Sequence, residues 1–107
     1  LITGARSLSF TLLELFDLFE ERASQRLRAG EIEDSTFEGY GYQKANIREF
    51  LAYKGKSRLL PQEFDRELCD EMMLYFKADI GHSHNYTATL VQHLKRVLLF
   101  GIDLKLY

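Results

Sequence analysis

The sequence predicts a small all-α domain, a bundle of four helices. Apolar residues recur at helical spacing in four segments, and no segment alternates apolar and polar residues as a half-buried strand does. The chain has 107 residues, of which 46% are hydrophobic and 28% are charged, so it suffices for one core. Short connections join the four segments, which places consecutive helices side by side in a bundle.

The first helix is predicted over residues 11–29. Thr11 and Glu14 have the spacing of a capping box, in which each side chain accepts a hydrogen bond from the backbone N–H of the other residue. Gly30 stands where a left-handed C-terminal cap is expected. The apolar face of this helix comprises Leu12, Leu15, Phe16, Phe19, Ala23 and Leu27.

The second helix is predicted over residues 36–54. Asp34 or Ser35 is expected to cap its start, and Gly55 to end it. Its apolar face comprises Phe37, Tyr40, Ile47, Phe50 and Leu51, so Tyr40 is expected to belong to the core.

Two glycines, Gly39 and Gly41, stand near the start of this second helix. Each interior glycine costs a helix about 1 kcal/mol relative to alanine, so their presence needs a reason. One explanation is that a DNA strand approaches the helix closely at Gly41, because helix N-termini present free N–H groups to phosphate. The other is that the glycines let a neighbouring helix pack tightly.

The third helix is predicted over residues 65–78, after a short turn near 61–64, and the fourth over residues 86–101, with Asn85 as its cap. The third is expected to bury Leu68, Met72, Tyr75 and Phe76. The fourth is expected to bury Tyr86, Leu90, Leu94, Val97 and Leu98.

Charge alternates along the chain, although the net charge is only −2. Residues 11–34 contain seven acidic and three basic residues, and residues 59–81 contain six acidic and two basic residues. Residues 35–58 contain five basic and two acidic residues, and residues 82–107 contain three basic and one acidic residue. If the basic second and fourth helices share a surface, it would suit phosphates. The alternative is that these charges are solvated helix faces with no binding role.

The bases of the two basic helices fall into stripes. On the second helix, residues at spacing i, i+3, i+4 and i+7 combine bases with small side chains: Gly41, Lys44, Ala45 and Arg48. On the fourth helix, polar side chains lie opposite the apolar face: Thr89, Gln92, Lys95 and Arg96. Such side chains contact phosphates and base edges in DNA. The nucleic-acid hypothesis depends on these two stripes forming one exterior surface.

Two segments carry a resemblance to a known family. The segment "TLLELFDLFEERASQRLRAGEIEDSTFEGYGYQKANIREFLAYKG" has an apolar first helix, then "GEIEDST", a tyrosine four residues after Thr36, and "REFL" at 48–51. The segment "HNYTATLVQHLKRVLLFGIDLKLY" has a threonine near the helix start, followed by "LK" and an apolar run. Over about residues 10–107, the chain resembles the core-binding domain of phage-type integrases, the tyrosine recombinases. It is most similar to those of Bacteroidetes mobile elements.

The resemblance implies a SAM-like four-helix bundle that grips one side of the DNA at a crossover site. In that family the second and fourth helices approach the DNA. The positions that would contact DNA here are Thr36, Lys44, Arg48, Thr87, Gln92, Lys95 and Arg96. Glu38 departs from the pattern, because family members often have a base just after the threonine.

The resemblance also implies the partners: double-stranded DNA, the catalytic domain of the same parent chain, and other recombinase protomers on the DNA. Residues 1–10 would be a lead-in from that longer parent, and residues 11–107 the domain itself. The catalytic arginine–histidine–arginine set and tyrosine nucleophile of the family lie in a separate domain. We therefore expect no catalytic residue here and no cofactor, in a protein of the bacterial cytoplasm that associates with the nucleoid when bound.

The other residues that could form a site are three histidines and one cysteine. His82, His84 and His93 lack a cysteine pair or a placed acidic partner, so no metal site is predicted, and His84 is a candidate phosphate contact. The single cysteine, Cys69, excludes an internal disulfide and borders an apolar face. No apolar run approaches the ~20 residues that span a bilayer, so no membrane partner is expected. The rival function is a protein-interaction domain of SAM or death-domain type, and a small enzyme is the third alternative.

Overall fold

The computed structural model describes residues 10–107, and all regular elements in this range are helical. The predicted all-α bundle of four helices is confirmed. The helices are α2 (Leu12–Arg28), α3 (Asp34–Lys54), α4 (Arg66–Leu74) and α5 (His84–Asp103). A 3-10 turn at Pro61–Glu63 precedes α4, and a π-helical turn at Tyr75–Ile80 continues it. The lead-in expected at 1–10 lies outside the described residues except for Phe10.

The start and end of α2 follow from local chemistry. Thr11 Oγ1 accepts a hydrogen bond from Glu14 N at 3.1 Å, and Glu14 Oε1 accepts one from Thr11 N at 2.9 Å, which closes the predicted capping box. Gly30 adopts a left-handed φ of 78°, and its N–H donates to the carbonyl of Leu27. These bonds satisfy backbone groups that have no partner within the helix.

The starts of α3 and α5 differ from prediction. Glu33 occupies the N-cap position of α3 without a side-chain hydrogen bond, so the prediction that Asp34 or Ser35 is the cap is wrong. The cap of α5 is Ser83, whose hydroxyl accepts from Tyr86 N at 3.1 Å. Asn85, the predicted cap, therefore lies inside the first turn of α5.

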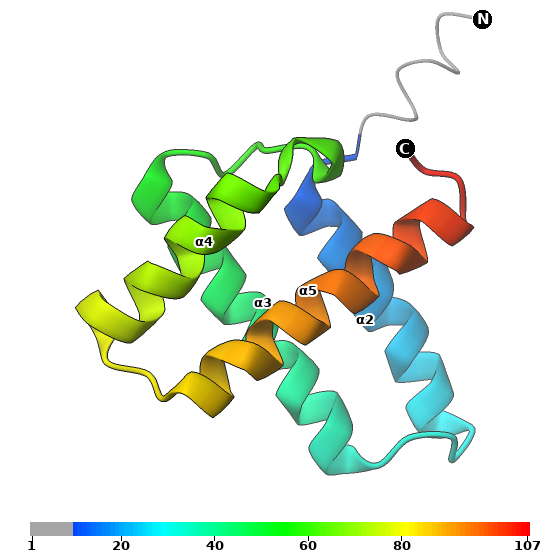
Figure 1. Ribbon diagram of the computed structural model, residues 1–107. Coiled ribbons are helices and arrows are strands. Elements are labelled where there is room, and N and C mark those ends of the chain that lie inside the picture. Colours follow the sequence, from blue (N-terminus) through cyan, green and yellow to red (C-terminus); the bar gives the residue numbers. More distant parts are fainter. Residues whose placement is uncertain (1–9) are drawn as a thin grey trace, which may run out of the picture.

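The helices pack in two layers. α2 and α3 lie against each other, and α5 crosses both of them (Figure 1). α4 and the π-helical turn that follows it complete the bundle, and the turn packs against α5. The core is formed by the apolar faces of all four helices and by one loop residue: Leu12, Leu15, Phe16, Phe19, Ile47, Phe50, Leu51, Leu59, Leu68, Met72, Phe76, Leu90, Leu94 and Val97.

Most residues of the apolar faces predicted from helical spacing are buried, and one needs a correction. Five others are only partly buried: Leu27, Phe37, Tyr40, Tyr75 and Leu98. Tyr86 was expected to point inward, but it is exposed at the start of α5. Its hydroxyl accepts a hydrogen bond from Asn46 Nδ2 of α3 at 3.0 Å. Its polar end is therefore bonded at the rim of the α3–α5 contact, and the ring does not enter the core. Leu98 is partly buried and packs on the core.

Candidate nucleic-acid interface

Lys44 belongs to the interface between α2 and α3. Its ammonium forms ion pairs with Asp17 and with Glu20, the latter at 3.1 Å, and its side chain is only 16% exposed. Burial acts to lower the pKa of Lys44, but hydrogen bonds and the charges of Asp17 and Glu20 outweigh it, so the pKa is raised above its ordinary 10.5. Two carboxylates already match this charge, so Lys44 offers little to a phosphate.

Arg96, a residue of α5, contacts α3 on the flank that faces α5. Its guanidinium carbon is 5.7 Å from the ring centroid of Tyr40, and its Nη1 is 3.1 Å from His93 Nδ1. Between the first half of α3 and the middle of α5 there is a pocket of about 210 Å³, which we call the α3–α5 groove. It is lined by hydroxyls, a glycine, aromatic rings, an amide and one cation: Ser35, Thr36, Gly39, Tyr40, Gln43, Thr89, His93 and Arg96.

His93 is a core residue that sequence reasoning missed. It is 2% exposed, and its ring stacks on Tyr40 with centroids 4.8 Å apart and meets Phe19 edge-on at 5.4 Å. Its position, three residues after Leu90 and four before Val97, was the signal that it shares their buried stripe.

The buried imidazole of His93 is neutral at pH 7. Burial, with a smaller contribution from the Arg96 charge, lowers the pKa of His93 to about 4. Because a guanidinium only donates hydrogen bonds, Nδ1 of His93 accepts from Arg96, and the ring proton is on Nε2.

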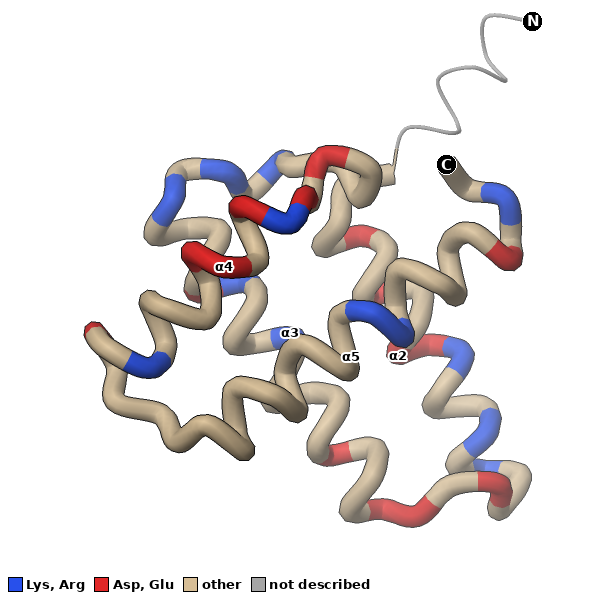
Figure 2. Tube along the Cα trace, viewed as in Figure 1, with Lys and Arg blue, Asp and Glu red and all other residues tan. Residues whose placement is uncertain are grey.

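The solvent-facing side of α5 is positively charged. Thr89, Gln92, Lys95 and Arg96 are exposed there. Within residues 10–107, neither Lys95 nor Arg96 has a carboxylate at ion-pair distance. The first acidic residue of α5 is Asp103, near its C-terminal end. In Figure 2 the basic segment of α5 lies at mid-helix, where α5 crosses in front of the α2–α3 layer.

The remaining predicted contacts divide between surface and core. Thr36 is exposed and lines the α3–α5 groove. Arg48 is exposed and follows Lys44 by one turn of α3, so it lies near the flank that faces α2. Thr87 is fully buried, and its hydroxyl donates to the carbonyl of Ser83 at 2.9 Å. The Thr87 hydroxyl is thus used inside the first turn of α5, and the structure gives its predicted contact with DNA no support.

The predicted single basic surface is thus not formed, because Lys44 is paired inside the α2–α3 interface. The premise of the two-helix nucleic-acid hypothesis fails with it, and any such interface depends on the basic side of α5 alone. Lys44 faces α2, whereas Arg96 lies in the groove beside Tyr40. The structure brings together Thr36 and Arg96, and it places Gln92 and Lys95 on the adjoining outer face of α5. This combination of the α3–α5 groove and the outer face of α5 is the candidate interface.

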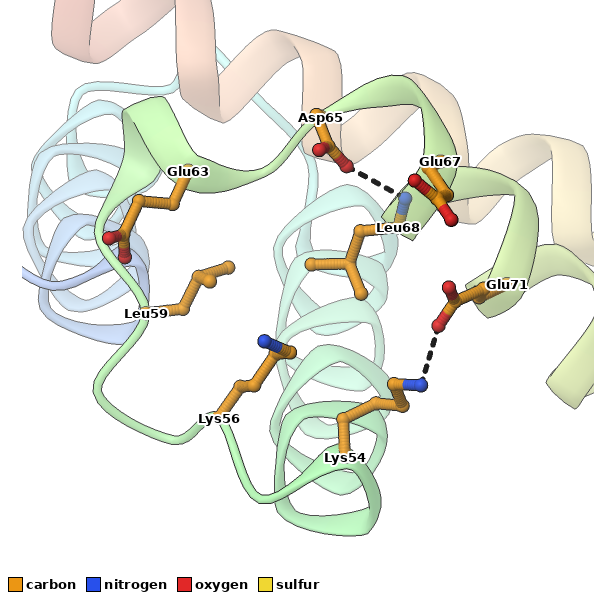
Figure 3. A pocket seen from close by; sticks show the side chains of 8 residues that line it. All are labelled: Lys54, Lys56, Leu59, Glu63, Asp65, Glu67, Leu68 and Glu71. Atoms are coloured by element: carbon orange, nitrogen blue, oxygen red, sulfur yellow. Dashed lines mark hydrogen bonds and ion pairs between the residues drawn. The ribbon is translucent and has the colours of Figure 1, made fainter.

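A separate pocket, of about 360 Å³, lies beside α4 and contains several acidic side chains (Figure 3). Three of its four acidic side chains have structural partners: Glu63 accepts from Leu60 N at 2.8 Å, and the other two are Asp65 and Glu71. Asp65 caps α4 by accepting from Leu68 N at 2.9 Å, and Glu71 pairs with Lys54 at 2.5 Å. In the part of the chain that the structure describes, no group of three or more histidine, cysteine or acidic residues could hold a metal ion.

A patch of exposed aromatic and aliphatic side chains lies where α3 ends beside the π-helical turn. Tyr53 and Leu74 are 61% and 67% exposed. Tyr53 stacks on Tyr75 with ring centroids 4.3 Å apart, and the Tyr75 hydroxyl donates to Glu49 at 2.9 Å. We call Tyr53, Leu74 and Tyr75 the aromatic patch.

Comparison with models of known protein families, with curated proteins and with solved structures found no significant match in any of the three. The integrase resemblance therefore stays a prediction that depends on the residues described above. None of the helices in residues 10–107 combines the length and the hydrophobicity that crossing a bilayer requires.

Proposed function

We propose that the chain is the core-binding domain of a site-specific tyrosine recombinase, which grips duplex DNA at a crossover site with α5 and the first turns of α3. The observation that carries this proposal is the pair of uncompensated cations, Lys95 and Arg96, on the exposed side of α5. The exposed neighbour Gln92 supplies an amide beside them, whereas the Thr89 hydroxyl donates to the carbonyl of Asn85 at 3.0 Å.

DNA phosphates bind most favourably to basic side chains that have no carboxylate partner. Affinity for DNA comes largely from lysine and arginine side chains that neutralise phosphates and release their counterions. A base that already has two carboxylate partners, as Lys44 has, gains little by moving to a phosphate. Threonine and glutamine side chains hydrogen-bond to phosphates or base edges, so the exposed Thr36 and Gln92 extend the same surface.

In this proposal the domain supplies grip and orientation, and chemistry belongs to the catalytic domain of the parent chain. The catalytic domain would clasp the opposite side of the duplex, and further protomers would join on the DNA. The acidic residues of α2 and α4 limit non-specific binding elsewhere on the surface.

The test is duplex binding by the 107-residue chain as a function of salt, measured by fluorescence anisotropy from about 50 mM upward. We expect binding whose logarithm falls linearly with the logarithm of salt concentration, with a slope of about −0.9 per phosphate contact. Lys95→Glu should weaken binding. Lys56→Glu makes the same change of net charge on the loop after α3, and it should have a smaller effect. Absence of binding at low salt, or an equal loss in both variants, would contradict the proposal.

The aromatic patch favours a second candidate, a protein-interaction domain of SAM or death-domain type. Exposed aromatic side chains are enriched at the centres of protein interfaces, and large exposed apolar patches mark such sites. If the patch binds a second copy of the chain, sedimentation velocity should show self-association that Leu74→Ser abolishes. A monomer at all concentrations, with duplex binding intact, would count against this alternative.

A further inference from the structure

The guanidinium of Arg96 is held in place at the mouth of the α3–α5 groove, although the side chain is exposed. It donates to His93 Nδ1 at 3.1 Å and lies 5.7 Å from the centroid of the Tyr40 ring. His93 and Tyr40 are themselves stacked at 4.8 Å and fixed by Phe19, which meets both rings edge-on. The two groups that contact Arg96 are therefore themselves packed against other rings.

None of these supporting groups cancels the charge of Arg96. The imidazole of His93 is neutral, and a guanidinium over an aromatic face keeps its full charge. Only one of the five N–H donors of Arg96 is used by His93, so the others are available to a ligand. A side chain that is already ordered also loses less conformational entropy when it binds.

We propose that His93 and Tyr40 are positioning residues, which orient the Arg96 guanidinium to bind one phosphate of the DNA backbone. The inference rests on the proposed function and deepens it. A phosphate is the favoured ligand because the guanidinium shares the groove with the Thr36 hydroxyl, and these two donors together suit phosphate oxygens. The Thr89 hydroxyl also lines the groove, but it already donates to the carbonyl of Asn85 at 3.0 Å.

The neutral state of His93 is necessary for this role. A protonated imidazole has two donors and no acceptor, so it could not accept from Arg96 and would repel it. Burial against Phe16, Phe19 and Tyr40 keeps the ring neutral.

The experiment is a double-mutant cycle between His93 and Arg96, read out as duplex affinity and as the slope of affinity against salt. Arg96→Gln should weaken binding about 10-fold for every duplex sequence and reduce the slope by about 1, as loss of one phosphate contact does. His93→Phe keeps a ring against Tyr40 but removes the acceptor. It should weaken binding roughly 3- to 10-fold with the slope unchanged, because the charge remains but is no longer ordered.

The double variant should bind no more weakly than Arg96→Gln alone. Tyr40→Leu removes the ring beneath the guanidinium and should act as His93→Phe does. It also serves as the second variant if thermal unfolding shows that His93→Phe is not folded. Tyr40→Phe is the matched control, because it keeps the aromatic face and should keep the affinity.

Two outcomes overturn the inference without touching the proposed function. If His93→Phe and Arg96→Gln weaken binding independently, His93 does not act through Arg96. If the loss in Arg96→Gln is confined to duplexes with a particular base, the ligand is a base edge and not a phosphate. Failure of the wild-type chain to bind any duplex at about 50 mM salt would instead refute the proposed function itself.

Discussion

Basic side chains on the two flanks of α3 have partners of different kinds. On the flank of α3 that faces α2, Lys44 is bound by Asp17 and Glu20. On the flank that faces α5, Arg96 is bound by His93 and Tyr40. Carboxylate partners cancel charge and tie two helices together, whereas neutral rings orient the charge and leave it available.

The difference shows why a basic helix is not by itself a binding surface. The stripe of α3 that contains Lys44 has the composition expected of a phosphate-binding face. Its use is decided by the side chains across the interface, and these belong to another helix. Stability measurements should respond to changes on the first flank, and ligand measurements to changes on the second.

The largest expected effect on stability is that of Lys44→Glu. The substitution places a third carboxylate beside Asp17 and Glu20 in a partly buried site, so the free energy of unfolding should fall by about 2–4 kcal/mol. Urea denaturation measures it. Arg48→Glu, one turn further along α3 and exposed, is the control and should change stability by less than about 1 kcal/mol. Equal effects would mean that the α2–α3 ion pairs contribute nothing specific.

A smaller effect is expected from acid. The pKa of His93 is about 4 in the folded chain and near 6.5 when unfolded, so between these values the unfolded state binds more protons. Stability is therefore complete above pH 6.5 and decreases as pH falls toward 4, with about 2 kcal/mol lost by pH 5. Denaturation of wild type and His93→Phe at pH 7 and pH 5 measures this loss, which the variant should lack.

The ion pairs of Lys44 act in the opposite pH range. Because the folded pKa of Lys44 is raised above 10.5, its contribution is complete below pH 10.5 and is lost as pH rises through the folded value.

A pH dependence of stability between pH 5 and 7 that persisted undiminished in His93→Phe would show that His93 is not its source.

The smallest effects concern Gly39 and Gly41. A Cβ at Gly39 would have no atom within 4 Å, and one at Gly41 would meet only Glu20 Oε2, at 3.7 Å. Tight packing of a neighbouring helix therefore does not explain either glycine. Alanine at each position should stabilise the chain by about 0.5–1 kcal/mol, because it removes backbone freedom from the unfolded state.

The same two variants show which flank DNA approaches. Gly39 lines the α3–α5 groove, so Gly39→Ala should lower duplex affinity if a DNA strand enters there. Close approach of DNA at Gly41 is one of the two explanations that the sequence leaves open, and a loss of affinity confined to Gly41→Ala would place the interface on the α2 flank.

Features decided within one helix could be predicted from the sequence. Thr11 and Glu14 cap each other, and Gly55 ends α3 in a left-handed conformation, as their spacing indicates. The starts of α3 and α5 could not be predicted as well, because several neighbouring polar residues compete as caps. Ser83 prevails over Asn85 where the chain leaves the left-handed Gly81 in an extended conformation.

The sequence by itself determined the four helices, the apolar stripe on each and the alternation of charge between them, because helical period fixes which residues share a face. Only the tertiary structure decided which charges meet. It placed Lys44 between two carboxylates, buried Thr87, and set the ring of Tyr40 from α3 against His93 and Arg96 of α5. The physical reason is that a helix fixes directions around its own axis, while the neighbour in each direction is chosen by how the helices cross.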